Sequence, residues 1–208
     1  MENINFIFPE IFISLSIMFL LVFGVFKKNS SSIVYSLTVI TLIIALGLLI
    51  NFPQDQEVNL FNNSYKIDRL SIFMKVITIV SGIFVLVSSY NYTKLEKISN
   101  IEYPILILCS ILGMMVMIGS YDLIVFYIGL ELQSLSLYVL AAFKENKKQS
   151  SEAGLKYFVL SALSSGLLLY GCSLIYGFSG STNFYLISEN IFSSENGNVF
   201  GLVFILVG

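Results

Sequence analysis

Apolar residues in this chain form long runs that are separated by short polar segments. Six runs are long enough to be membrane-spanning helices, at residues 9–26, 33–52, 70–90, 104–120, 123–143 and 155–178. A helix needs about 20 predominantly apolar residues to cross the hydrocarbon core of a bilayer. The runs are continuous and lack the period-two alternation of barrel strands, which favours helices. A seventh run begins near Val199 and continues to Gly208.

This pattern predicts an all-α fold, a polytopic transmembrane bundle with six complete spans and the start of a seventh. The whole of residues 1–208 is expected to form a single transmembrane domain. The composition agrees, because 56% of the residues are apolar, 12% are charged and the mean hydropathy is +0.86. A soluble domain carries roughly a quarter charged residues, so a soluble enzyme is excluded. The expected surroundings are the lipid bilayer, and no nucleic-acid partner is expected.

The residue types also limit the cofactors. The sequence contains no histidine, which excludes a histidine-ligated haem or metal site within this chain. Its two cysteines, Cys109 and Cys172, lie inside apolar runs. Two thiols cannot hold an iron–sulfur cluster, and buried cysteine usually packs as a small apolar residue. No cofactor or metal is therefore expected in this chain.

The basic residues of the loops predict the orientation. The first, third and fifth loops hold seven lysines, namely Lys27, Lys28, Lys94, Lys97, Lys144, Lys147 and Lys148. The other loops hold only Lys66 and Arg69. Basic loops stay on the cytoplasmic or matrix side, so the N-terminus is predicted to face the periplasm or intermembrane space. The longest outer loop, residues 179–198, is rich in Ser, Asn and Gly and is expected to be irregular.

Glu131 is the ionisable residue that lies farthest from the ends of a predicted span. It is about nine residues into the fifth span, too deep for its side chain to reach water. Tyr127, Ser134 and Tyr138 share its helical face, because the spacings are four, three and four residues. Such a line of hydroxyls around a carboxyl can hold water and pass protons. The alternative is a protonated glutamate that only bonds a neighbouring helix.

Two lysines are also candidates, and each has a simpler explanation. Lys156 lies at the inner end of the sixth span, where it could extend to the membrane surface and pair with Glu152 one turn earlier. Lys75 lies about five residues into the third span and is expected to extend to the outer surface near Asp68. The sequence therefore leaves the role of Lys156 open and favours a purely structural role for Lys75.

Two acidic residues occur at predicted helix starts. Asp122 begins the fifth span, and Glu10 follows Pro9 at the start of the first. An acid at a helix N-terminus is favourable through capping and the helix dipole. Both are therefore expected to have structural roles.

Several segments together resemble one known family. They are residues 121–140 (YDLIVFYIGLELQSLSLYVL), residues 151–158 (SEAGLKYF), the sequence GLLLYG at residues 166–171, PEIF at residues 9–12 and DRLS at residues 68–71. They are similar to the antiporter-like subunit N of respiratory complex I, called subunit 2 in mitochondria. The resemblance covers essentially the whole chain and is closer to subunit N than to its sister subunits L and M.

The resemblance implies a role in proton translocation coupled to electron transfer from NADH to quinone. It implies about fourteen spans, built as two inverted five-helix repeats that form a pair of half-channels. Glu131 matches a glutamate that pairs with a lysine of the broken seventh helix. Lys156 matches a lysine of the sixth helix near the inner side. Both residues are therefore expected to take part in proton translocation, whereas Lys75 matches no such site.

This chain departs from the family where it ends at Gly208, within the seventh apolar run. The expected lysine of that helix and the second repeat are absent, so we expect a truncated product or one half of a split subunit. The missing C-terminal half would then come from the full-length protein or from a second chain. The other expected partners are the membrane-arm subunits of complex I, in a bacterial inner membrane or mitochondrial inner membrane. An Mrp-type cation/proton antiporter subunit and an inactive structural fragment are the alternatives.

Overall fold

The structure is a computed structural model that describes residues 6–26, 31–51, 57–95, 100–144, 147–190 and 197–208. Six of its helices are long and apolar enough to cross a membrane, which confirms the predicted fold class. They are α1 (Phe8–Phe26), α2 (Ser31–Ile50), α3 (Arg69–Leu95), α4 (Glu102–Gly119), α5 (Leu123–Ala141) and α6 (Lys148–Ser179). A further helix, α8 (Gly197–Val207), occupies most of the seventh apolar run.

Some helices are longer than the apolar runs that predicted them. The third helix continues to Leu95, and the sixth begins at Lys148. Apolar runs mark the membrane-embedded length, whereas helical hydrogen bonds continue into polar sequence beyond it. The sixth helix stops at Gly180, which adopts the left-handed conformation (φ 73°) that commonly ends a helix.

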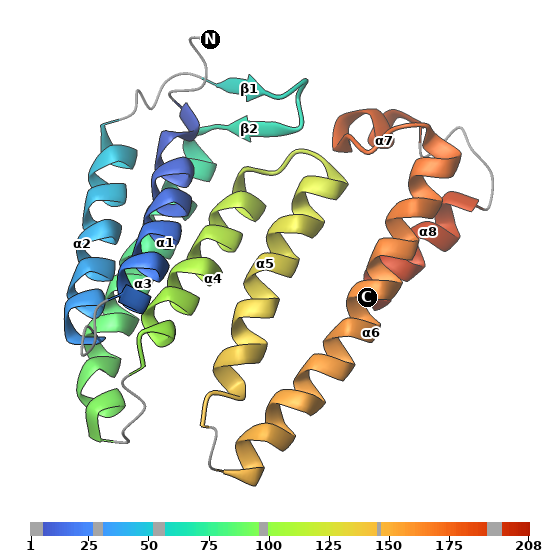
Figure 1. Cartoon of the computed structure of the whole chain (residues 1–208). Helices are drawn as coiled ribbons and strands as arrows, with labels where there is room; N and C mark the ends of the chain where they lie inside the picture. The colour runs from blue at the N-terminus through green and yellow to red at the C-terminus, as the bar shows by residue number, and fades with distance from the viewer. Residues whose placement is uncertain (1–5, 27–30, 52–56, 96–99, 145–146, 191–196) are drawn as a thin grey trace.

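The helices divide into a closed bundle and a more open part. Helices α1 to α4 surround a common core that includes Ile13, Leu42, Ile79 and Leu108, all fully buried. Helix α5 packs on α4, and α6 then packs on α5 and on α8 (Figure 1). Only 22% of the most apolar part of α5 and of α6 is buried, against 33–50% for α1 to α4. Much of α5 and α6 is therefore uncovered by this chain.

Helices α4 and α5 touch at their backbones. A Cβ atom placed on Gly113 would lie 2.6 Å from the backbone nitrogen of Gln133, and one on Gly129 would lie 2.8 Å from that of Met117. Small residues allow such close approach between membrane helices. The two helices therefore form a tight antiparallel hairpin that joins the closed bundle to the open part.

A two-stranded antiparallel hairpin covers one end of the bundle. It consists of β1 (Val58–Leu60) and β2 (Tyr65–Ile67), and its turn holds Phe61, Asn62 and Asn63 with positive φ angles. Helix α7 (Phe184–Asn190) lies at the same end, which is the predicted outer end (Figure 1).

Helix α7 corrects the prediction that residues 179–198 are irregular. The side-chain oxygen of Asn183 accepts a hydrogen bond from the backbone N–H of Tyr185 at 3.0 Å, which caps the first turn. Ile187 is buried against the cluster that contains Leu123 and Ile175. This cap and this anchor explain a helix in a sequence whose composition is typical of a loop. Residues 191–196 of the predicted loop lie outside the described part of the chain.

Candidate functional site

Glu131 lies half-buried in the middle of α5. Its carboxylate accepts hydrogen bonds from the hydroxyl of Tyr127 at 3.2 Å and from the hydroxyl of Ser134 at 3.3 Å. Both donors come from α5 itself, one turn before and one turn after the glutamate. In the part of the chain that the structure describes, these hydroxyls are the only hydrogen-bond donors to the carboxylate. Three of the four residues predicted to share this face are therefore in contact.

The fourth residue of that face, Tyr138, has different neighbours. Its buried ring makes edge contacts with Tyr157 of α6, at 4.8 Å between ring centroids, and with Phe158 at 5.8 Å. It packs the C-terminal half of α5 against the N-terminal half of α6. The predicted line of hydroxyls therefore consists of Tyr127 and Ser134 around the Glu131 carboxylate. Tyr138 makes aromatic contacts with α6 instead of extending that line.

Lys156 lies on α6 and is not brought to Glu131. Its ammonium is 2.6 Å from the Glu152 carboxylate, and both side chains are exposed, at 69% and 62%. This is the one-turn pairing that the sequence suggested as the simpler explanation. The exposed position also leaves Lys156 open to contact from outside this chain.

The sequence analysis missed a buried ion pair between α1 and α3. The Lys75 ammonium lies 2.6 Å from the Glu10 carboxylate, and these side chains are 1% and 6% exposed. The Tyr65 hydroxyl donates to the same oxygen of Glu10 at 3.0 Å, and its ring centroid is 4.9 Å from the Lys75 nitrogen. Burial and the Glu10 charge raise the pKa of Tyr65 well above its ordinary value. The phenol therefore remains a proton donor.

This pair corrects two expectations. Lys75 does not extend to the outer surface, because it lies on the buried face of α3 with Ile72, Ile79 and Leu86. The spacing of these residues by three, four and seven is the signal that could have placed Lys75 inside. Glu10 does lie in the first turn of α1, as expected, but its carboxylate is directed into the bundle. Its role is therefore larger than that of a cap.

Asp122 has the structural role that the sequence predicted. Its carboxylate accepts a hydrogen bond from the backbone N–H of Ile124 at 2.8 Å and caps α5. The other carboxylate oxygen accepts from the Thr182 hydroxyl. Asp122 thus ties the start of α5 to the segment that precedes α7.

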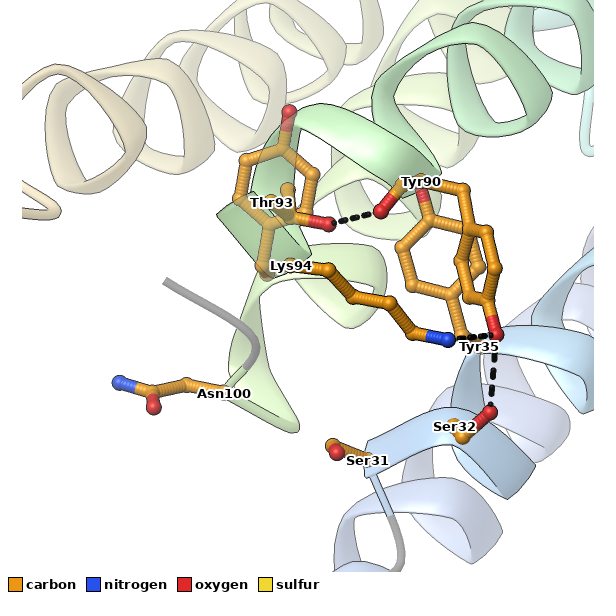
Figure 2. Close-up of a pocket in the computed structure, with 8 residues that line it drawn as sticks. Ser31, Ser32, Tyr35, Tyr90, Thr93, Lys94 and Asn100 are labelled. Atoms are coloured by element: carbon orange, nitrogen blue, oxygen red, sulfur yellow. Dashed lines mark hydrogen bonds between the residues drawn. The ribbon is translucent and has the colours of Figure 1, made fainter. Parts of the chain in front are cut away.

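A small polar pocket lies at the opposite end of the bundle, between α2, α3 and α4. Its lining includes Ser32, Tyr90 and Lys94. Figure 2 shows Lys94 donating to the Tyr90 hydroxyl, which also bonds Ser32, at 2.7 and 3.0 Å respectively. These polar groups satisfy one another. Among the described residues, no group of three carboxylate or thiol side chains is placed to hold a metal ion.

Comparison with known proteins gives consistent matches. A family model described as "NADH:quinone oxidoreductase/Mrp antiporter, TM" matches residues 120–208. The chain is 66% identical over its whole length to NADH-quinone oxidoreductase subunit N of Pelagibacter ubique and covers 44% of that protein. It is 47% identical over 97% of its length to subunit N of Bartonella bacilliformis and covers 42% of it. The resemblance to subunit N is confirmed, and the chain spans less than half of these relatives.

Two solved structures share the fold. One is a chain of respiratory complex I from Thermus thermophilus with bound aureothin, with a TM-score of 0.80, 24% identity and coverage of 96% of this chain and 42% of that one. The other belongs to a membrane-bound sulfane sulfur reductase, an archaeal respiratory membrane complex, with a TM-score of 0.80, 19% identity and coverage of 98% and 43%. The arrangement of helices therefore recurs in membrane subunits of respiratory complexes.

Proposed function

We propose that this chain, which is similar to NADH-quinone oxidoreductase subunit N along its whole length, is the N-terminal portion of such a subunit. The protein would be an antiporter-like subunit of the complex I membrane arm, and it would contribute to proton translocation coupled to electron transfer from NADH to quinone. The observation that carries this proposal is the Glu131 carboxylate, held in the middle of an apolar helix by two hydroxyl donors.

The chemistry of Glu131 suits a residue that gains and loses a proton. Its carboxylate accepts hydrogen bonds from two hydroxyls, and in general an opposite charge nearby favours the ionised form of a carboxyl group. The resemblance to subunit N assigns that charge to a lysine of the seventh helix. When the lysine loses its proton or moves away, the carboxylate is left in an apolar setting and takes up a proton. Alternation between these two states would transfer protons along the membrane arm.

Lys156 is proposed as a second participant, nearer the inner surface. Its partner in this chain, Glu152, is exposed, so Lys156 can exchange protons with groups outside the chain. The electron-transfer steps would take place in other subunits, because this chain is proposed to hold no redox centre. The complex would lie in a bacterial inner membrane or a mitochondrial inner membrane, with this N-terminus on the periplasmic or intermembrane side. The other membrane-arm subunits and the remaining half of subunit N would be its partners.

The test is to replace Glu131 with glutamine in the full-length protein within the assembled complex. Glutamine keeps the size of the side chain but cannot ionise, so we expect fewer protons pumped per NADH oxidised. Glu102→Gln is the matched control, because Glu102 is an exposed carboxylate in the first turn of α4. Unchanged pumping in an assembled Glu131→Gln complex would refute the proposal.

The alternative function is that of an Mrp-type cation/proton antiporter subunit. The description of the matching family model covers both kinds of protein, which is the observation that keeps this alternative. Sodium-dependent transport without an NADH-linked partner would favour it.

A further inference from the structure

The buried pair between Glu10 and Lys75 is separate from the Glu131 site. Helix α4 packs against α1 and α3 and also against α5, so it lies between the two sites (Figure 1). The pair therefore requires its own explanation.

Stability alone does not account for this pair. Burying two charges costs several kcal/mol for each ion, and a well-packed apolar pair is often at least as stable. Ionisable side chains within the membrane region are therefore functional candidates by default. Glu10 and Lys75 are nearly fully buried at the end of the bundle that the hairpin covers.

The hydrogen bonds around Glu10 are incomplete. One carboxylate oxygen has both Lys75 and Tyr65 as partners, at 2.6 and 3.0 Å. The other oxygen is buried and has no hydrogen-bond partner among the described residues. An unpaired oxygen of a buried carboxylate is costly, and protonation of that oxygen removes the charge. The arrangement therefore leaves one position on Glu10 where a proton can bind.

Tyr65 can adjust to either protonation state of Glu10. Its hydroxyl has one proton and two acceptors in reach, the Glu10 carboxylate at 3.0 Å and the Met115 carbonyl at 3.3 Å. It can donate to Glu10 when the carboxylate is ionised and to Met115 when Glu10 is neutral. The Tyr65 ring faces the Lys75 ammonium in both cases, so the lysine keeps a favourable contact when its counter-ion is lost.

Tyr65 places the hairpin directly over the pair. It lies in β2 next to Lys66, whose side chain is partly exposed. Its ring fills the space beside Gly119, where a Cβ atom would lie 2.2 Å from the ring. Only a glycine at the end of α4 lets the phenol reach Glu10. The hairpin therefore contributes one side chain, Tyr65, directly to the carboxylate.

We propose that Glu10, Lys75 and Tyr65 form a second proton-exchanging site beneath the hairpin. A proton from the adjacent aqueous phase forms an O–H bond with the unpaired oxygen of Glu10 and later returns to that phase. Among the described residues, the titratable groups of the site are these three side chains, and α4 contributes the Met115 carbonyl. The inference goes beyond the proposed function and stands without it, because protonation of Glu10 can be measured without turnover.

The test is infrared difference spectroscopy of the full-length protein in its complex, recorded over a pH series. A carbonyl signal of a protonated buried carboxyl should titrate in the wild type, disappear in Glu10→Gln and persist in Glu131→Gln and Glu102→Gln. Persistence of every titrating carboxyl signal in Glu10→Gln, or loss of the Glu10 signal in Glu102→Gln, would overturn the proposal. If Glu131→Gln pumps normally while the Glu10 signal titrates, only the proposed function fails.

Tyr65→Phe gives a second measurement that does not change the charge of the pair. It keeps the ring beside Lys75 and removes the hydroxyl that favours the ionised carboxylate. We expect the Glu10 signal to persist to higher pH by about one unit, a tenfold change in proton affinity. An unchanged midpoint would contradict the assigned role of Tyr65, and this result is available even if Glu10→Gln fails to assemble.

Discussion

Glu10 and Glu131 are both carboxylates within apolar helices, and their surroundings differ. Glu10 belongs to the closed bundle of α1 to α4 and is paired with an ammonium that this chain itself supplies. Glu131 belongs to the more open part, is half-buried and receives only hydroxyl hydrogen bonds from its own helix among the described residues. A fully buried charge is costly unless an opposite charge lies next to it, whereas a half-buried charge is less costly to leave without one. The difference shows that this chain itself supplies the counter-charge of Glu10, whereas Glu131 has only hydroxyl partners among the described residues.

The largest expected effect is on the closed site. Lys75→Met removes the counter-charge and leaves the buried Glu10 with Tyr65 as its only donor among the described residues. This change should lower the free energy of unfolding by about 3–5 kcal/mol. The measurement is denaturant unfolding of the full-length protein in mixed micelles. Replacing both residues, as Glu10→Leu with Lys75→Met, should recover most of this loss because no unpaired charge remains. An equal loss for Glu131→Leu would contradict the comparison, because no counter-charge of Glu131 lies among the described residues.

A smaller effect is expected at the contact that joins the two parts. Gly113→Ala places a methyl group against the backbone of α5, so the helices must separate, at a cost of about 2–3 kcal/mol by the same unfolding measurement. Gly47→Ala in α2 is the control, since no atom lies within 4 Å of its added Cβ. That substitution should be neutral or stabilising by up to about 1 kcal/mol, through better helix propensity. Similar results for both variants would mean that α4 and α5 are not held together by backbone contact.

The smallest effect concerns an exposed ion pair beside the buried one. Lys66 lies 3.1 Å from Glu57, and this hydrogen bond raises the pKa of Lys66 above its ordinary value. Its contribution is fully present below the ordinary pKa of 10.5 and is lost as pH rises through the raised value. Lys66→Met should therefore cost less than about 1 kcal/mol at neutral pH, and the difference from wild type should vanish in strong alkali. A cost that grows with pH would contradict this sign.

The membrane spans and the local face around Glu131 were predictable, because both follow from spacing along one segment. Tyr127 and Ser134 contact Glu131 as helix periodicity requires, and Asp122 caps α5. The pair of Glu10 and Lys75 was not predicted, since it depends on how α1 and α3 are placed by their packing against α2 and α4. The hairpin has strands of only three residues, too short for a clear alternating pattern. The hairpin matters because it carries Tyr65, and the role of Tyr65 depends on its contacts with Glu10 and Lys75 in the folded bundle.

The order in which the chain is made adds a consequence for the buried pair. Glu10 is synthesised 65 positions before Lys75, and at roughly 5–20 residues per second this separates the two by several seconds or more. During this interval Lys75 is not there to pair with Glu10, and a carboxyl that enters an apolar environment without a counter-charge is favoured as the neutral acid. The ion pair then forms only when the third helix arrives and takes its place. Biogenesis would thus pass Glu10 through the same protonated state that its unpaired oxygen allows in the finished protein.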